Sequence, residues 1–445
     1  MQTHGGTDPS PAGQAEFAVA AYGRPMSHSR NRRYTALVGV AALTLTAAAV
    51  PAGAHDRGKD HGGHDRGQHG KHRGEKVRFA TFNASLNRAE EGQLEQDLST
   101  RENTQARNVA ETIQRADPDV VLVNEFDYSR KAARLFRDNY LEVGQRGADP
   151  VRYRYHYIAP SNTGIPSGHD LNNDGTVGGP DDALGFGEFP GQYGMVVYSK
   201  YPIDECRVRT FQDFRWKDMP GNRIPAGFYD KAERRSLRLS SKSHWDLPIR
   251  IGRERVHLLA SHPTPPTFDG EEDRNGRRNA DEIRFWADYV SGGRDARYIY
   301  DDDGRRGGLH PRASFVIAGD QNADPHDGDS FDGAISQLLD HRRVNTSMTP
   351  TSRGAVEASE EQGGVNDEHA GDPAQDTADF AEPPGNIRAD YVLPSRDLAI
   401  REARVFWPTS EHPLSRLTGT YPFPTSDHRL VWVDTTVGKR HPHGR

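Results

Sequence analysis

The stretch 314–322 reads Ser-Phe-Val-Ile-Ala-Gly-Asp-Gln-Asn, an apolar run that ends in a carboxylate and an amide. A short continuous apolar run closed by a glycine predicts a buried strand. Asp320 and Asn322 are therefore expected at the end of that strand. Their oxygen-bearing side chains suit the binding of a hard divalent metal ion or of groups around a phosphate.

Other apolar segments meet a polar side chain in the same way. They are residues 77–82 before Asn83, residues 119–124 before Glu125, residues 256–261 before His262, and the alternating run 430–433 after Ser426-Asp427-His428. Strands that stop together can bring such side chains into one cleft. We therefore expect these residues and Asp320 to share a site.

Composition limits the class of protein. The chain has 445 residues, enough for one large domain or two ordinary ones, and its 45 Gly and 29 Pro predict long loops. The net charge of −7 is unlike that of a generic nucleic-acid binder, whose affinity depends on basic groups. Cys206 is the single cysteine, so no internal disulfide can form, and we expect a small buried core residue there.

Residues 1–54 have the pattern of an N-terminal extension with a secretory signal peptide. Arginines between positions 30 and 33 precede a small-residue apolar stretch, 35–50, and the following Ala-Gly-Ala predicts cleavage after Ala54. The protein is therefore expected outside the cell. A single membrane anchor is the alternative, although the stretch is shorter than the ~20 strongly apolar residues of a membrane span.

The rest of the chain divides into a linker, one folded domain and a tail. Residues 55–76 are His- and Gly-rich and predict a solvated, disordered linker, although their histidines could instead chelate a metal. We expect the domain to span 77–437, followed by a tail, 438–445. Residues 353–386 are acidic and rich in Gly and Pro, which predicts a mobile surface loop.

Helical and extended patterns are mixed over the whole domain, which predicts layered α and β structure. Helices are expected at 101–116, 129–140, 279–290 and 331–339, and further strands at 193–199, 235–240, 390–394 and 429–437.

The order of the motifs is more specific than any one of them. The set comprises Thr81-Phe82-Asn83, Asn124-Glu125, Ser261-His262, Gly-Asp-Gln-Asn at 319–322, Ala389-Asp390-Tyr391 and Ser426-Asp427-His428, with Gln192–Ile203 as a "G-x-x-x-x-S-x-x-P-I" strand. This set resembles the endonuclease/exonuclease/phosphatase superfamily over residues 77–437. The resemblance implies a four-layer α/β/β/α sandwich, two packed mixed sheets flanked by helices, with the site at the top of the sheets.

The resemblance also implies a metal-dependent hydrolase acting on phosphoric ester bonds. Glu125 would be the principal ligand of Mg²⁺ (or Mn²⁺), with Asn83 beside it, and Asp427 would be a further ligand. Mg²⁺ prefers oxygen ligands and keeps several waters, so few protein ligands suffice.

The remaining motif residues would carry out the acid–base chemistry. His428 would take a proton from the attacking water, and Asp390 would fix its tautomer. Asp320 and Asn322 would position the water and the phosphoryl group, and His262 would donate to a phosphoryl oxygen or aid the leaving group. Structural alternatives remain open: Asp390 could pair with a neighbouring arginine, and His262 could be an ordinary satisfied histidine.

A second, separate metal site is predicted by residues 170–181, Asp-Leu-Asn-Asn-Asp-Gly-Thr-Val-Gly-Gly-Pro-Asp. Its ligands would be Asp170, Asn172, Asp174, the Thr176 carbonyl and Asp181, with a glycine at the sharp turn. The loop resembles the dockerin type and predicts a structural Ca²⁺; an Asx-rich turn without an ion is the alternative.

The sequence leaves the substrate open. We expect a phosphate ester, small or lipid-linked, because no basic run with interleaved aromatics marks a duplex footprint. A secreted nuclease of the same mechanism and a catalytically inactive calcium-binding module are the alternatives. Trp216, Trp245 and Lys242 could line a substrate pocket, although packing explains the tryptophans equally well. No stable protein partner is implied.

Overall fold

The computed structural model describes residues 74–438. The predicted signal peptide, its cleavage site, most of the 55–76 linker and nearly all of the tail therefore lie outside the described residues. Ordered structure begins at Glu75, slightly before the expected boundary. Within 74–438, no helix combines the length and the apolar character needed to cross a membrane.

Two mixed sheets form the centre of the domain. Their strands are β1 (Glu75–Leu86), β2 (Val120–Phe126), β3 (Tyr155–Tyr157), β4 (Met195–Ser199), β5 (Arg209–Thr210), β6 (Trp245–Ile251), β7 (Glu254–Ala260), β8 (Ser314–Asp320), β11 (Asp390–Pro394), β12 (Ala399–Val405) and β13 (Val431–Val437). One sheet has the order β12-β13-β1-β2-β4-β3, and the other β11-β8-β7-β6-β5. A separate short pair joins β9 (Ala378–Asp379) to β10 (Asn386–Ile387).

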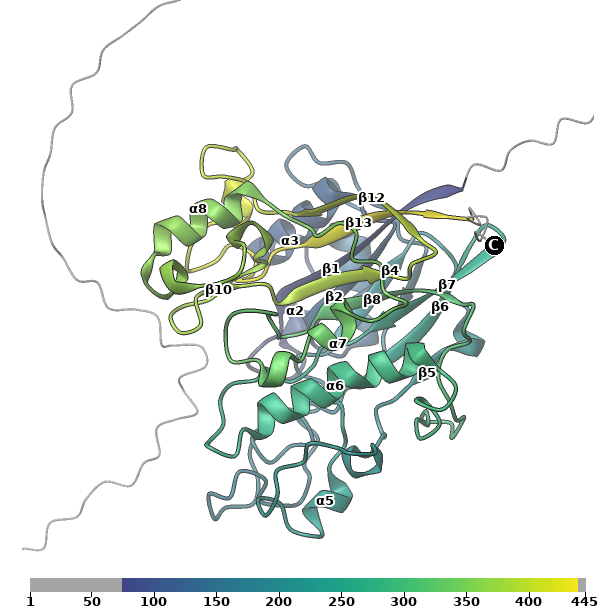
Figure 1. The fold of residues 1–445 in the computed structure, drawn as a ribbon. Coiled ribbons are helices and arrows are strands. Elements are labelled where there is room, and N and C mark those ends of the chain that lie inside the picture. Colours follow the sequence, from purple (N-terminus) through teal and green to yellow (C-terminus); the bar gives the residue numbers. More distant parts are fainter. Residues whose placement is uncertain (1–73, 439–445) are drawn as a thin grey trace, which may run out of the picture. The chain divides into compact units, whose positions relative to one another are not determined.

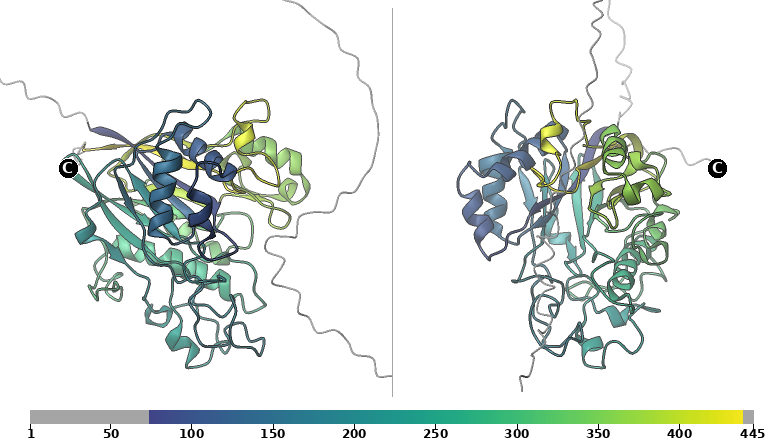
Figure 2. Two further views of the ribbon diagram at one scale, coloured as in Figure 1. Left: turned by 180° about the vertical axis from the view of Figure 1, so that it is seen from behind. Right: turned by 90° about the vertical axis from the view of Figure 1, so that its left-hand side faces the viewer.

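Helices cover the outer faces of both sheets (Figures 1 and 2). The α-helices are α2 (Gln93–Leu98), α3 (Thr104–Ala116), α4 (Arg130–Phe136), α5 (Glu233–Ser236), α6 (Arg274–Ser291), α7 (Ser336–Leu339) and α8 (Arg353–Gln362). Short 3₁₀ or π turns occupy Arg137–Leu141, Glu205–Arg207, Trp216–Asp218, Phe331–Gly333, Gly364–Glu368, Pro373–Gln375 and Ser415–Leu417.

Three apolar clusters define the layers. One lies between the sheets and includes Phe79, Leu122 and Val316. A second packs α3 and α4 against the β1–β2 sheet, and a third packs α6 against the β7–β8 sheet, as the edge-on view in Figure 2 shows. The domain is therefore the predicted four-layer α/β/β/α sandwich.

Strand direction brings the motif residues to one edge. β1 and β2 are parallel in the first sheet, and β7 and β8 are parallel in the second, so each pair ends at the same edge. β11 is antiparallel to β8, with Asp390 directly opposite Asp320. The side chains that follow or close these strands therefore meet between the two sheets.

The helix predictions hold best where the chain carries its own caps. α3 begins after Asn103, whose side chain accepts from Ala106 N–H, and α4 begins after Ser129, which accepts from Ala132 N–H. The predicted helix at 279–290 belongs to the longer α6. The predicted helix at 331–339 is only a 3₁₀ turn followed by the short α7.

Other expectations are wrong. Residues 353–386 are not an irregular loop, because Ser352 caps α8, and 3₁₀ turns and β9–β10 follow. Residues 235–240 form the end of α5 and an irregular segment rather than a strand. Cys206 is exposed, since it lies in a 3₁₀ turn at the surface. Trp216 and Trp245 are fully buried, so they pack the core and line no substrate pocket.

Candidate active site

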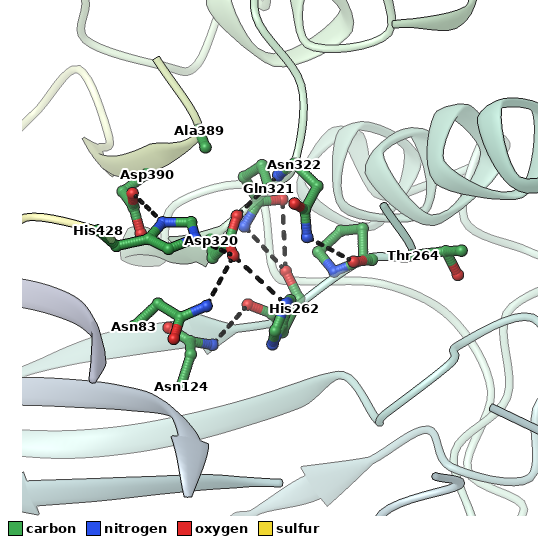
Figure 3. A network of polar contacts seen from close by, with 12 residues as sticks. Asn83, Asn124, His262, Thr264, Asp320, Gln321, Asn322, Ala389, Asp390 and His428 are labelled. Carbon is green, nitrogen blue, oxygen red and sulfur yellow. Dashed lines mark hydrogen bonds and ion pairs between the residues drawn. The ribbon is translucent and has the colours of Figure 1, made fainter. Parts of the chain in front are cut away.

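Asp320, the last residue of β8, lies at the centre of the converging side chains. Its Oδ2 atom accepts a hydrogen bond from Asn83 Nδ2 at 3.1 Å and lies 3.3 Å from His262 Nε2 (Figure 3). Asn83 is the last residue of β1 before the register of the strand shifts, and its contact with Asp320 joins one sheet to the other. All three side chains are at most 2% exposed.

Gly319 permits the close approach of the end of β8 to the end of β7. The backbone has φ 147 there, and a Cβ would collide with the carbonyl oxygen of Ser261. The end of β8 can therefore lie directly against the end of β7, which carries His262. A side chain at position 319 would displace Asp320.

His428 is held from one side and approached from the other. Its Nδ1 atom and Asp390 Oδ2 are 2.8 Å apart, while its Nε2 atom is 3.6 Å from Asp320 Oδ2, too long for a hydrogen bond (Figure 3). The Thr377 hydroxyl donates to the same Asp390 oxygen at 2.9 Å. This pairing makes Nδ1 the donor to Asp390, so Nε2 faces the centre of the site.

Without a bound metal ion, the neighbouring carboxylates favour the imidazolium form of His428. Burial opposes that form, but the Asp390 and Asp320 carboxylates raise the pKa of His428 well above its ordinary value. His262 behaves in the opposite way: burial, with Lys242 nearby, lowers its pKa to about 4. His262 is therefore neutral near pH 7, and its buried Nδ1 has no hydrogen-bond partner among the described residues.

Glu125 and Asp427 form a second, acidic part of the site. Burial, followed by the charge of Asp427, raises the pKa of Glu125 to about 7. Both residues are half-buried, in contrast to the fully buried Asp320 and Asp390. Glu125 has φ 55, a left-handed conformation that is rare for a glutamate and that tends to occur at functional sites.

Asn322 shows the same backbone feature. It has φ 49, its N–H donates to Asp320 Oδ1 at 2.9 Å, and its Nδ2 donates to the Pro263 carbonyl at 3.1 Å. These bonds tie the loop after β8 to the loop after β7. In this arrangement the side chain of Asn322 supports its neighbours as well as facing the site.

The structure therefore brings all the motif residues together: Asn83, Glu125, His262, Asp320, Asn322, Asp390, Asp427 and His428. The alternative partner for Asp390 is not used, because Asp390 bonds to His428 and Thr377. Their individual roles in chemistry remain predictions.

Lys242 contributes a buried positive charge to this site. It is 7% exposed, and its ammonium group makes no hydrogen bond or salt bridge with any residue of 74–438. Burial lowers the pKa of Lys242, while the Glu282, Glu125 and Asp320 carboxylates act to raise it. Sequence reasoning placed Lys242 among the residues that could line a substrate pocket but had no signal to single it out.

Helix α6 holds the loops that carry these groups. Asn279 Nδ2 donates to the carbonyls of Thr264 at 2.8 Å and Gln321 at 2.9 Å, and Glu282 accepts from the N–H groups of Ser241 at 2.8 Å and Thr264 at 2.7 Å. Asn279 and Glu282 are fully buried. Sequence reasoning missed both, although polar residues three apart on an otherwise apolar helix face were a usable signal.

The donor set fits a hard divalent cation. Carboxylate and amide oxygens from Glu125, Asp427 and Asn83 are the ligands that Mg²⁺ prefers. Burial, and then the charge of Asp427, raises the pKa of Glu125 to about 7, and a cation beside Glu125 would favour its ionised form. Among residues 74–438, Asp320, Asp390 and His428 also have ligand atoms within 4.8 Å of one another. The His428–Asp390 hydrogen bond already uses one ligand atom of each of those two residues, so the Glu125 side is favoured.

The predicted calcium loop folds around its own polar side chains. Asp170 accepts from the N–H groups of Asp174 at 3.1 Å and Gly175 at 2.9 Å, and Asp174 accepts from Thr176 N–H at 2.8 Å. Asn172 Nδ2 donates to Asp174 Oδ2 at 3.1 Å. Asp170, Asn172 and Asp174 thus converge, as an Asx-rich turn or an ion site would require.

Asp181 does not complete this loop. Its side chain is exposed, whereas Asp182 is buried and accepts from the N–H groups of Leu171 and Gly178. Asp182 therefore closes the loop through backbone hydrogen bonds. The calcium assignment remains a prediction, with Asp182 better placed than Asp181.

Comparison with known proteins identifies the family. The model of the Endonuclease/Exonuclease/phosphatase family matches residues 80–428, and the chain belongs to this family. Members of the family are hydrolases that act on phosphoester bonds and generally use a divalent metal. No curated protein matches the chain.

Several solved structures have a similar backbone. An endonuclease/exonuclease/phosphatase from Beutenbergia cavernae DSM 12333 is 17% identical, with a TM-score of 0.47, and the match covers 83% of this chain and 74% of that one. Sphingomyelinase C from Streptomyces griseocarneus is 17% identical, with a TM-score of 0.43 over 81% and 99% of the two chains. Truncated TDP2 from Caenorhabditis elegans is 14% identical, with a TM-score of 0.39 over 81% and 98%.

Proposed function

We propose that this protein is a secreted, divalent-metal-dependent phosphoesterase that uses His428 to activate water. The observation that supports this most directly is the placement of His428. Its Nδ1 is bound by Asp390, and its Nε2 lies 3.6 Å from Asp320 without a hydrogen bond, beside the Glu125–Asp427 carboxylates. A water molecule between Nε2 and Asp320 would be held for deprotonation.

Glu125, Asp427 and Asn83 would hold the metal ion, which supplies positive charge to the phosphoryl oxygens. In the protein alone, the surrounding carboxylates favour a protonated His428. Positive charge at Glu125 and Asp427 lowers the pKa of His428 toward the neutral base that the reaction needs.

The reaction then follows from the positions of the side chains. Water attacks phosphorus and gives its proton to His428 Nε2, while Asp390 stabilises the imidazolium that forms. The bond from phosphorus to the ester oxygen breaks with its electron pair on that oxygen, which then takes a proton from solvent, while the imidazolium of His428 later returns its proton to solvent. Lys242 lies where it can neutralise a phosphoryl oxygen, and Asn322 and Asp320 orient the group under attack.

The proposed substrate is a small or lipid-linked phosphate ester. The net charge of −7 disfavours long-range attraction of a polyanionic duplex. The guanidinium of Arg278 is used internally, because it donates hydrogen bonds to the carbonyls of Leu239, Leu184 and Arg238. A secreted nuclease of the same mechanism is the alternative, and an inactive calcium-binding module is the alternative of another class.

Export is part of this proposal because residues 30–54 have the order of a signal peptide. N-terminal sequencing of the protein from the culture medium should begin at His55. Retention of residues 1–54 on a membrane-bound protein would support the anchor instead.

One assay tests the proposed activity. Purified protein is given a chromogenic phosphodiester, a chromogenic phosphomonoester and plasmid DNA, each with Mg²⁺, Mn²⁺ or Ca²⁺ and with EDTA. We expect EDTA-sensitive turnover of a small ester and loss of about three orders of magnitude in the variant His428→Ala, as for removal of a general base. Cleavage of DNA alone would favour the nuclease, and no turnover with calcium still bound would favour the inactive module.

A further inference from the structure

A group of acidic side chains lies behind the candidate active site and is not used by the proposed mechanism. Asp376 follows the 3₁₀ turn Pro373–Gln375 and precedes β9. It is 7% exposed, and its carboxylate makes no hydrogen bond or salt bridge with any residue of the described chain. A buried carboxylate without a partner is costly unless it is neutralised by a proton or a cation.

The carboxylate of Asp376 faces a small cavity. The cavity has a volume of ≈ 50 Å³, and its lining includes Asp327, Ser359 and His369. A single water needs about 10–15 Å³ on this measure, so the space admits an ion with part of its water shell. Ser359 is 8% exposed and lines the same cavity, and its hydroxyl makes no hydrogen bond within residues 74–438, so a second oxygen ligand is available here.

The charges around Asp376 all have the same sign. Burial, with the nearby Asp324, Asp327 and Asp372 carboxylates, raises the pKa of Asp376 to about 8. The Asp324 and Asp327 carboxylates accept hydrogen bonds from backbone N–H groups, and neither brings a basic side chain to Asp376. Within residues 74–438 no basic side chain is bonded to Asp376, so its carboxyl must be neutralised by a proton or by a cation.

We propose that this cavity binds a calcium ion, held by the carboxylate of Asp376 and the hydroxyl of Ser359, with Asp327 reached through water. Oxygen ligands from separate segments, in an irregular arrangement, suit Ca²⁺ better than the strict octahedron of Mg²⁺. The acidic and histidine ligand atoms here do not come within 4.8 Å of one another in threes, so the ion keeps some of its water. The site is distinct from residues 170–181.

The ion would connect two segments that support catalysis. Asp327 lies on the loop that follows Asn322, and Asp376 is next to Thr377. The Thr377 hydroxyl accepts from Asp390 N–H and donates to Asp390 Oδ2, both at 2.9 Å, and the same oxygen bonds to His428. Calcium binding at Asp376 should therefore steady the residues that orient His428.

The test compares Asp376→Asn with the wild type and with Asp329→Asn, an exposed aspartate on the same loop as Asp327. All three also carry Asp174→Ala, so that the 170–181 loop does not contribute, and saturating Mg²⁺ occupies the active site. Thermal melting is measured in calcium chelator and at about 1 mM Ca²⁺, the range of extracellular calcium modules. Calcium binding per chain is measured by equilibrium dialysis with radioactive Ca²⁺.

Without calcium, Asp376→Asn should melt at or above its parent, because it removes a charge from an acidic cluster. With calcium, the parent and Asp329→Asn should gain a few degrees and bind one more ion per chain than Asp376→Asn. If Asp376→Asn does not fold, Ser359→Ala serves instead, with an affinity for calcium lowered several-fold.

Equal calcium stabilisation and equal stoichiometry in all proteins would overturn the proposal and leave Asp376 as a protonated acid. If, with calcium chelated, removing Mg²⁺ destabilises the parent but not Asp376→Asn, the choice of calcium is overturned. Neither readout uses phosphoesterase activity, so the result is independent of the proposed function.

Discussion

Lys242 and His428 show how single residues set the charge of the site. Lys242 brings a positive charge without a fixed partner, and His428 is surrounded by carboxylates that favour its charged form. A bound phosphate group would pair with the Lys242 ammonium. A divalent cation would offset the negative charge of the carboxylates around His428. The site is therefore electrostatically incomplete until both ligands are present.

The variant Lys242→Met tests whether the positive charge of Lys242 contributes to catalysis. We expect Lys242→Met to lower kcat/KM by about 10–100-fold, since one charged donor to a phosphoryl oxygen is removed. The melting temperature should be unchanged or higher, because a buried unpaired ammonium is lost. The exposed Lys231→Met is the matched control and should match the wild type in both measurements. A large stability loss with unchanged kinetics would make Lys242 a structural residue.

The sequence predicted the residues that end strands, because an apolar run followed by Asp, Asn or His is visible in one segment. It did not single out Lys242, which lies in a polar Ser-rich stretch without a pattern. Nor did it show that Asp376 lacks a partner, since partners are a property of the folded chain. Asp181 was chosen over Asp182 by loop spacing alone, and the fold buries the second.

Helix α6 is the element that organises the two loops beside the site. Its apolar face packs against the β7–β8 sheet, while Asn279 and Glu282 reach the backbone after β7 and β8. The apolar periodicity predicted this helix, but not its polar contacts. The prediction for α8 failed, because the Gly, Pro and acidic residues of 353–386 predicted a loop where the chain forms a capped helix.

Removing the amide of Asn279 tests the role of α6. We expect Asn279→Ala to cost about 2–3 kcal/mol of unfolding free energy, because buried carbonyls of Thr264 and Gln321 lose their donor. Urea unfolding measures this value. Activity should fall as well, since the loops carrying His262 and Asn322 loosen. Wild-type stability together with wild-type kcat would show that these bonds do not hold the site.

At the scale of the whole domain, the site exists because two sheets end at one edge. Asn83 and Glu125 come from one sheet, and Asp320 and Asp390 from the other. The motif order indicated the fold through family resemblance, whereas apolar patterns alone could not have given the strand order β12-β13-β1-β2-β4-β3. Nonlocal pairing depends on packing between segments far apart in the chain, which no local pattern encodes.

The proposed mechanism requires a divalent cation next to His428, held by Glu125, Asp427 and Asn83. Crystals soaked with Mn²⁺ and measured at the manganese absorption edge test it most directly. We expect an anomalous peak within about 2.0–2.4 Å of a Glu125 oxygen, with a coordinated water facing His428 Nε2. A peak enclosed by Asp320, Asp390 and His428, with the His428–Asp390 hydrogen bond broken, would contradict it, as would no peak at this edge of the sheets.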